Sequence, residues 1–534
     1  MKRLILLAAT GFAALSSAHA ATLVVCTEAS PAVLNAQLST ANTVFDVAAQ
    51  VYDELVETER GGSKIIPALA ESWTIAPDAM SATFKIRHGV KFQSNAKFTP
   101  TRELNADDVI FSFHRMMDKS DPFNAISGGT YDEYDALLRD RVKGIEKVDA
   151  YTVRFDLAVP VAPLLGILSM QSFAIQSAEY AQAMLAAKTP EQLDTQPIGT
   201  GAFSFVQYAR DSTIRFRAFA QSWVKDAGLE DRVAKVDQLV FSITPDPAIR
   251  LAKLRAGECQ IARYPNPTDF NGIKADAQLV LAAGPLASMG YVSFRSDKPP
   301  FDKLEVREAL ATAIDLKSLV SAVFQGTGEP TAALISPSLW GHNDQVKPRP
   351  YDPAAAKAML AKAGYPDGFK TTIWAIPVAR AYMPNGRRAA EMIQADWAKI
   401  GVQAEIVSYE WGEYLRRVRA GEAPVGMLGG TWDYPDPSQL VFNYWACPDG
   451  KPRPGDFGHW CNAEFSDLVS KANVISDQAE RAKLYVQAQD VFAKDVPGIL
   501  FADTQAYTAI RKNVSGYKVH VLGGTPYGGI SVAP

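Results

Sequence analysis

The stretch that decides the fold runs from Lys370 to Leu440 and reads KTTIWAIPVARAYMPNGRRAAEMIQADWAKIGVQAEIVSYEWGEYLRRVRAGEAPVGMLGGTWDYPDPSQL. Residues 371–378 form an apolar run, which predicts a buried strand. After a loop, apolar residues recur at spacings of four, four and three over residues 389–400, as on one face of a helix. Gly401 follows at the position where such a helix is expected to end.

The same stretch continues with two more predicted strands and a second helix. Apolar and polar residues alternate over 402–406, which predicts a half-buried strand. An apolar stripe over 411–418 indicates a helix, and residues 425–428 indicate a third strand that ends in a loop over 429–437. Strands that alternate with helices in this way favour a parallel α/β sheet with right-handed crossovers.

Two charged residues lie just past the predicted strand ends. Arg380 follows the first strand and Asp433 follows the third. Ligands of open α/β sheets bind outside the carboxyl ends of the strands, so a cation and an anion placed there could hold the two ends of a zwitterion. The alternative is that both are solvated loop charges, which are common on protein surfaces.

Length and composition indicate a globular protein with room for several domains. The chain has 534 residues, of which 47% are hydrophobic and 21% are charged. The formal net charge is −4, and it becomes −6 once Lys2 and Arg3 are removed with the segment described next. The chain has no basic block, which argues against nucleic acid or an anionic membrane surface as a partner.

Residues 1–20 have the pattern of a secretory signal. Lys2 and Arg3 precede an apolar region over residues 4–16, and Ala18-His19-Ala20 has the small-x-small form of a cleavage site. No other stretch approaches the roughly 18 consecutive apolar residues that span a bilayer. We therefore expect an exported, soluble mature chain that begins at Ala21.

The cysteine count fits an exported protein. The four cysteines are Cys26, Cys259, Cys447 and Cys461, and an even count outside the cytoplasm suggests disulfides. Four cysteines allow three pairings; Cys447–Cys461 would close a short loop rich in Pro and Gly, and Cys26–Cys259 would then be the long-range bridge. A zinc site is the weaker alternative, because there is no CxxC and His459 stands alone near Cys461.

Outside the deciding stretch the chain divides into two regions. Short alternating strands dominate up to about Pro285, and regular alternation of helices and strands follows. No Gly-x-Ser-x-Gly, His-Glu-x-x-His or phosphate-binding loop occurs, and Gly199-Thr200-Gly201 is best interpreted as a tight turn before a strand. We predict no catalytic residues, no metal and no cofactor, although Asp433 and Asp436 leave a carboxylate pair, as in a secreted peptidase, as an alternative.

Several runs of residues resemble a known family along nearly all of the mature chain. The chain is similar to the peptide- and nickel-binding solute receptors that supply ABC importers, extracellular solute-binding proteins of family 5, and in particular to their periplasmic dipeptide-binding members. The runs that carry the resemblance are CTEASP at 26–31, TRELNADDV at 101–109, PIGTG at 197–201, YPNP at 264–267, AEMIQADWAK at 390–399 and YEWGEYL at 409–415.

The resemblance implies a two-lobed α/β periplasmic binding protein fold of type II, with an extra strand-rich subdomain in the first lobe. It implies that residues 21–285 and 504–534 form lobe I and residues 286–503 form lobe II. It supports the pairings Cys26–Cys259 and Cys447–Cys461. It also implies closure of the lobes on a ligand by a hinge motion.

The resemblance further implies which residues bind the ligand. Asp433 matches the aspartate that holds the amino group of a peptide, and Arg380 matches the arginine that holds its carboxylate. Four neighbouring residues are candidates to line the site: Thr40, Tyr382, Thr431 and Trp432. The tryptophan departs from the family pattern, since Gly-Trp-Thr-Gly is replaced by Gly429-Gly430-Thr431-Trp432.

The expected function is that of a monomeric periplasmic receptor. It would bind a dipeptide between its lobes and deliver it to an inner-membrane ABC permease, without enzymatic activity or nucleic acid. The alternatives within this class are receptors for oligopeptides, glutathione, haem or an amino-acid conjugate. A secreted peptidase and a structural or chaperone role are the alternatives from other classes.

Overall fold

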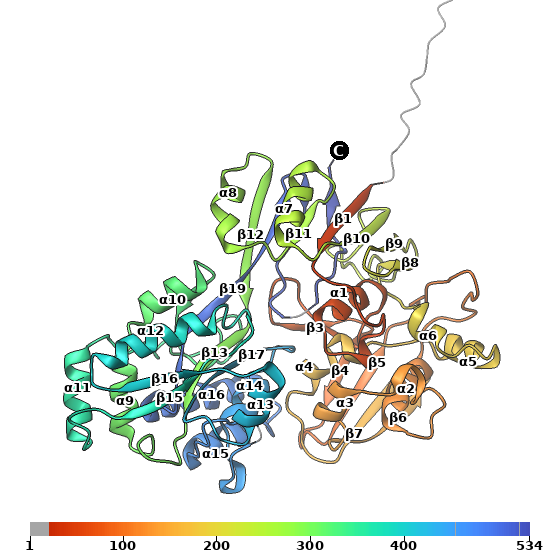
Figure 1. The fold of residues 1–534 in the computed structure, drawn as a ribbon. Helices are drawn as coiled ribbons and strands as arrows, with labels where there is room; N and C mark the ends of the chain where they lie inside the picture. The colour runs from red at the N-terminus through yellow and green to blue at the C-terminus, as the bar shows by residue number, and fades with distance from the viewer. Residues whose placement is uncertain (1–20, 454, 523, 534) are drawn as a thin grey trace, which may run out of the picture.

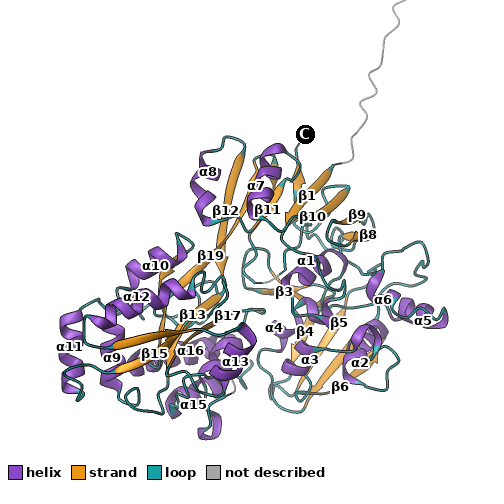
Figure 2. Cartoon of the chain, in the orientation of Figure 1, coloured by secondary structure: helices purple, strands orange, loops and turns teal. Residues whose placement is uncertain are grey.

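The computed structural model describes residues 21–453, 455–522 and 524–533, and the predicted signal segment over 1–20 lies outside them. The described chain forms two bodies, which Figure 1 shows at the right and at the lower left, and they are called here the first and the second lobe. The first lobe contains an eight-stranded and a four-stranded sheet, and the second contains a five-stranded sheet. Helices flank strands in both lobes (Figure 2). The predicted two-lobed α/β fold is confirmed.

The eight-stranded sheet has the strand order β12-β19-β11-β1-β10-β9-β8, and β14 pairs with β19 beside this path. The central strand β1 is parallel to β10 and to β11, whereas β19 is antiparallel to β11 and β12. The strands are β1 (Thr22–Thr27), β8 (Phe203–Ala209), β9 (Thr213–Ala218), β10 (Gln238–Ile243), β11 (Ile261–Arg263), β12 (Leu279–Leu286), β14 (Gly328–Pro330) and β19 (Ala502–Arg511), and the helices beside them are α1 (Asn42–Val51), α7 (Pro247–Ala256) and α8 (Phe270–Ala275).

The four-stranded sheet, in the order β4-β5-β7-β6, corresponds to the extra strand-rich subdomain that the resemblance implied. A separate core lies beneath it, in which Phe84, Phe113 and Phe155 are buried. Its elements are β4 (Ala70–Ile75), β5 (Ser81–Ile86), β6 (Val142–Asp149), β7 (Thr152–Leu157), α2 (Ala106–Met117), α3 (Asp132–Leu137), α4 (Leu164–Leu168), α5 (Ala178–Ala186) and α6 (Gln192–Thr195). Two short ladders, β2 (Val56–Thr58) with β3 (Ile65–Pro67) and β20 (Val514–Ser515) with β21 (Ser531–Val532), complete the described strands outside the second lobe.

The five-stranded sheet of the second lobe has the order β16-β15-β17-β13-β18. Its strands β15, β16 and β17 are parallel, as predicted, and β13 adds an antiparallel partner on the other side of β17. The elements are β13 (Ser288–Phe294), β15 (Lys370–Trp374), β16 (Gln403–Val407), β17 (Val425–Thr431), β18 (Gly498–Leu500), α9 (Leu304–Thr312), α10 (Leu316–Phe324), α11 (Pro353–Lys362), α12 (Gly386–Ala398), α13 (Trp411–Arg419), α14 (Ser438–Trp445), α15 (Ala463–Ala472) and α16 (Gln478–Asp495). Short 3-10 turns lie at Ala36–Leu38, Ile126–Gly128, Gln171–Phe173, Pro267–Asp269 and Pro448–Gly450.

Two of the predicted strand limits in the second lobe are wrong. The strand expected over 371–378 is β15, which ends at Trp374, three residues before Pro377, a residue that has no backbone N–H for a sheet. The strand expected over 425–428 is β17, which continues through Gly429, Gly430 and Thr431. These three residues pair with β13, so the loop begins only at Trp432.

Two neighbouring strands carry the chain between the lobes. β12 leads into β13 of the second lobe, and β19 follows β18 back to the first lobe, where it pairs with β11. β12 and β19 pair with each other from Leu279–Arg511 to Leu286–Thr504, and Figure 1 shows both running from the upper part of the molecule toward the second lobe. The predicted lobe boundaries, at 285/286 and 503/504, fall within these strands and stay a prediction.

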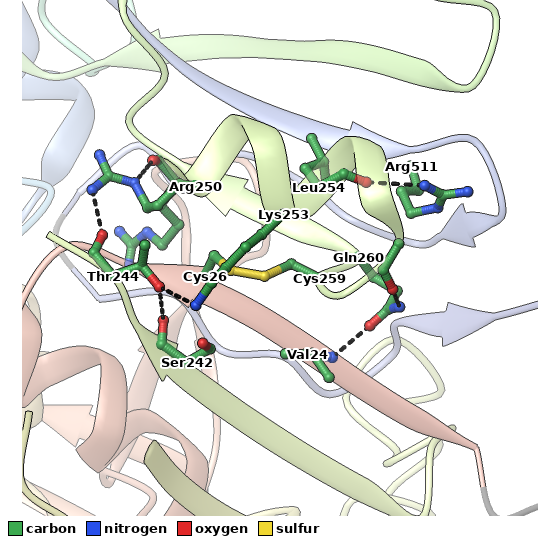
Figure 3. Close-up of a disulfide and its surroundings, with 12 residues drawn as sticks. Val24, Cys26, Ser242, Thr244, Arg250, Lys253, Leu254, Cys259, Gln260 and Arg511 are labelled. Atoms are coloured by element: carbon green, nitrogen blue, oxygen red, sulfur yellow. Dashed lines mark hydrogen bonds between the residues drawn. A yellow bond between two sulfur atoms is a disulfide. The ribbon is translucent and has the colours of Figure 1, made fainter. Parts of the chain in front are cut away.

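Both expected disulfides are present. Cys26 of β1 is bonded to Cys259, just after α7, with their Cα atoms 5.9 Å apart, and Cys447 is bonded to Cys461 with Cα atoms 5.3 Å apart. Figure 3 shows the first bridge between β1 and α7, where Gln260 also accepts a hydrogen bond from the Val24 amide at 2.8 Å. Among the described helices, none is long and apolar enough to cross a bilayer.

Candidate functional site

The candidate site lies beyond the carboxyl ends of β15 and β17. These strands are parallel neighbours through the pairs Ile373–Val425 and Trp374–Gly426, so the loops that follow them leave the sheet at the same edge. Arg380 is on the first loop and Asp433 is on the second. The predicted position of both charges past the strand ends is therefore confirmed.

Arg380 is exposed, and its backbone is held by a small closed turn. Its N–H donates to the Met383 carbonyl at 3.1 Å, and the Met383 N–H donates back to the Arg380 carbonyl at 2.9 Å. Met383 is fully buried and anchors the turn in the core of the second lobe. The guanidinium lies over the ring of Trp411 at 5.2 Å, and it has no carboxylate partner among the described residues.

Asp433 is a half-buried anion held by an amide instead of a cation. Its Oδ2 accepts from Gln439 Nε2 at 2.6 Å, and its own N–H donates to Gln439 Oε1 at 2.8 Å. Gln439 lies in the first turn of α14, so the start of this helix fixes the carboxylate. Burial raises the pKa of Asp433 to about 6, although the Gln439 hydrogen bond acts in the opposite direction. Within the described residues, Asp433 forms no ion pair.

Tyr382 covers the sheet between the two loops. Its ring lies against Gly429 and its carbonyl against Gly290, and a Cβ at either glycine would collide with it. Burial raises the pKa of Tyr382, while the nearby Arg380 charge acts in the opposite direction. Tyr444 of α14 approaches from the other side, since a Cβ at Gly430 would lie 3.1 Å from its hydroxyl oxygen.

The remaining predicted site residues lie in different surroundings. Thr431 is half-buried at the end of β17, and Thr40 is exposed on the loop before α1, in the other lobe. Trp432 is completely buried in the core of the second lobe, and its Nε1 has no hydrogen-bond partner among the described residues. Arg380, Tyr382, Thr431, Trp432 and Asp433 therefore belong to one lobe and Thr40 to the other, and a role in binding stays a prediction for all six residues.

Asp436 has a structural role in the turn before α14. Its carboxylate accepts from the Ser438 N–H at 3.0 Å at the start of α14 and from both terminal nitrogens of Arg481, at 2.7 and 2.8 Å. Both side chains of this ion pair are buried, so Asp436 is committed to structure and does not form a carboxylate pair with Asp433. No group of three or more His, Cys, Asp or Glu residues able to hold a metal ion occurs among the described residues.

Three residues that surround Asp433 are not predicted from the sequence: Gln439 of the second lobe, and Glu54 and Glu133 of the first. Gln439 follows the loop by only a few positions, and its place at the start of a helix after Pro437 was the available signal. Acidic residues of the first lobe have no local signal that would connect them with Asp433. Glu133 of α3 has its pKa raised to about 7 by burial and by the Asp433 charge, and Glu54 lines the same cavity as Asp433.

Comparisons with known proteins identify the family of the chain. The family model described as bacterial extracellular solute-binding proteins, family 5 Middle, matches residues 64–452. The chain is 43% identical to the dipeptide-binding protein of Escherichia coli strain K12, over 97% of this chain and 96% of that protein.

Two solved structures extend the likeness to the fold. HbpA2 from Haemophilus parasuis superposes with a TM-score of 0.91 at 39% identity, covering 96% of this chain and 100% of that one. The dipeptide-binding protein from Pseudoalteromonas sp. SM9913, solved in complex with Met-Leu, gives a TM-score of 0.75 at 32% identity, again covering 96% and 100% of the two chains.

Proposed function

The chain belongs to the bacterial extracellular solute-binding proteins of family 5, and on that premise we propose that it is a receptor that binds dipeptides between its two lobes. Asp433 receives the α-ammonium group of the peptide and Arg380 receives its carboxylate. Tyr382 and Thr431 line the floor between them, and Thr40 and Trp432 complete the predicted set.

One observation carries this proposal. A half-buried carboxylate and an exposed arginine, neither with an oppositely charged partner among the described residues, follow two adjacent parallel strands. Leaving a charge unpaired in a closed site is costly, so the pair favours a ligand that brings one charge of each sign. The planar guanidinium suits a carboxylate, and the Asp433 carboxylate accepts hydrogen bonds from an ammonium group. A dipeptide spans about 7 Å when extended, so two fixed charges also select ligand length.

Substitution of the two charged residues tests the proposal. We expect Asp433→Ala and Arg380→Ala each to weaken the binding of Ala-Ala by roughly 3–5 kcal/mol, measured by titration calorimetry. The matched controls are Asp467→Ala and Arg387→Ala, which remove exposed charges from α15 and α12 and should leave the affinity unchanged. Near-wild-type affinity in both test variants would overturn the assignment of the two residues.

The wider function follows from the family. We propose that the receptor works in the periplasm as a monomer after removal of residues 1–20, and that it passes its ligand to an inner-membrane ABC permease. It needs no cofactor and no nucleic acid, and it does not hydrolyse the peptide. Incubation with Ala-Ala distinguishes a receptor from a peptidase: the receptor returns one intact dipeptide per chain, whereas release of free alanine would refute this part of the proposal.

A further inference from the structure

A second set of charges faces Asp433 from the first lobe. Asp433 lines a cavity whose other walls come from the end of α1 and the segment that follows it, from Arg232 and from the C-terminal tail near His520. The cavity offers about 50 Å³ of space to water and is partly open to solvent. The position of Asp433 on its wall means that a ligand group held by this carboxylate lies at the edge of the cavity.

Acids outnumber bases on the walls of this cavity. The carboxylates are Asp53, Glu54, Glu57 and Asp433, and the guanidinium groups are Arg60 and Arg232. His520 also lines the cavity, but burial lowers its pKa to about 4, so it contributes no charge near neutral pH. With all the carboxylates ionised, the cavity would therefore carry an excess of negative charge.

Two of the first-lobe acids already have partners. Asp53 Oδ2 accepts from the Thr200 hydroxyl at 2.6 Å and from the Trp223 indole N–H at 2.7 Å. Glu57 Oε2 lies 2.7 Å from Arg232 Nη1, which forms an ion pair. Both carboxylates thus have partners within the protein, whereas Arg232 Nη1 and Nη2 are buried and, apart from the ion pair with Glu57, have no hydrogen-bond partner among the described residues.

Arg60, the other base on the cavity wall, does not form an ion pair with Glu54, the other first-lobe acid. Arg60 Nη1 donates to the carbonyls of Pro526 and Gly528, at 2.9 and 3.1 Å, so it is held by the C-terminal tail. Glu54 is 4% exposed, and its Oε1 has no hydrogen-bond partner among the described residues. Burial, followed by the charges of Glu57 and Asp53, raises the pKa of Glu54 well above its usual range. Glu54 is therefore a buried carboxyl whose Oε1 lacks a donor, although its own backbone N–H donates to the carboxylate.

We propose that this cavity receives the side chain of the first residue of the bound peptide and selects a cationic one, lysine or arginine, whose head group pairs with Glu54. The inference rests on the proposed function, because Asp433 places the first residue at the cavity only if it holds the α-ammonium group. An ammonium or guanidinium group supplies the donor that Glu54 Oε1 lacks. An apolar side chain of equal length would fill the space and leave this oxygen without a partner.

Four dipeptides test the selection in wild-type protein by titration calorimetry. Lys-Ala and norleucine-Ala differ in the charge of the first side chain, and Ala-Lys and Ala-norleucine differ in the charge of the second. We expect Lys-Ala to bind about tenfold or more tightly than norleucine-Ala, the lower end of the range for a hydrogen bond to a charged group. The two peptides that begin with alanine should differ by much less.

A substitution assigns the preference to Glu54. Glu54→Gln keeps the shape of the side chain and should bring the Lys-Ala to norleucine-Ala affinity ratio close to one. Glu71→Gln, which changes an exposed glutamate of β4, should keep the wild-type ratio. Thermal denaturation checks that the Glu54→Gln variant is folded. If this variant does not fold, the comparison of the four peptides in wild-type protein still tests the selection.

The outcomes separate this inference from the proposed function. Tight binding of all four peptides without a preference for Lys-Ala, or a preference that survives Glu54→Gln in folded protein, overturns the selection and leaves the dipeptide receptor intact. Failure of every dipeptide to bind overturns the proposed function and the inference with it.

Discussion

At the scale of single residues, the role proposed for Asp433 predicts a pH dependence of binding. Burial raises its pKa to about 6, and only the ionised carboxylate attracts an ammonium group. Protons therefore compete with the ligand near and below pH 6, and we expect dipeptide affinity to level off about one pH unit above the pKa and to fall by up to about tenfold per pH unit below it. Calorimetric titrations with Ala-Ala between about pH 4.5 and 7.5 measure this dependence.

The variant Asp433→Asn provides the control for this pH dependence. Its affinity should be low and should no longer show the fall with decreasing pH that protonation of Asp433 causes. The pKa of Glu133 is raised to about 7 first by burial and in part by the Asp433 charge, and the Asp433→Asn substitution removes only the second of these causes. A fall that is equally steep in Asp433→Asn would show that another group controls binding.

The two end charges could be predicted from the sequence, but their surroundings could not. Arg380 and Asp433 follow apolar runs that are recognisable as strands, and the parallel order of those strands places both at one edge. The clamp from Gln439 depends on the exact start of α14, and Glu54 faces Asp433 only because the two lobes meet. Trp432 is a candidate to line the site because it precedes Asp433, but its side chain is buried in the core of the second lobe.

At the scale of elements, periodicity predicted β15, α12, β16, α13 and β17 in the right order because each has an apolar pattern of its own. The last three residues of β17 could not be assigned this way, since two successive glycines are typical of a loop. They belong to the strand because they pair with β13, and Gly429 is a glycine because the Tyr382 ring occupies the space where a Cβ would lie. The reason for the glycine thus lies in another segment of the chain.

This packing predicts the effect of adding one methyl group. A Cβ at position 429 would collide with the Met289 carbonyl and would lie 2.5 Å from Tyr382 Cδ2. We expect Gly429→Ala to destabilise the protein by about 1–3 kcal/mol and to weaken dipeptide binding, because either β13 or Tyr382 must move. Chemical denaturation measures the first effect and calorimetry the second.

A nearby glycine supplies the control for this substitution. Gly412, in the first turn of α13, has only the flexible carboxylate end of Glu410 near its Cβ position, at 3.2 Å, so Gly412→Ala should be tolerated. Equal stability and affinity in the two alanine variants would contradict the packing argument for Gly429.

At the scale of the whole molecule, β12 and β19 are placed to act as the hinge. The two strands pair side by side and connect the lobes, so a change in their twist would move one lobe relative to the other. The Cys26–Cys259 bridge lies within the first lobe, where it does not restrain such a motion, whereas Val521 and Leu522 of the C-terminal tail pack in the core of the second lobe and would have to follow it.

Closure is also what the distribution of charges requires. Asp433 and Arg380 are on the second lobe, whereas Glu54 and Thr40 are on the first, so water leaves the ligand only when the lobes approach. We expect saturating Ala-Ala to decrease the radius of gyration measured by small-angle X-ray scattering. The same peptide concentration should leave the scattering of Arg380→Ala unchanged, because that variant is not saturated. Scattering that does not change while calorimetry shows wild-type protein to be fully occupied would mean that the receptor binds its ligand without closing.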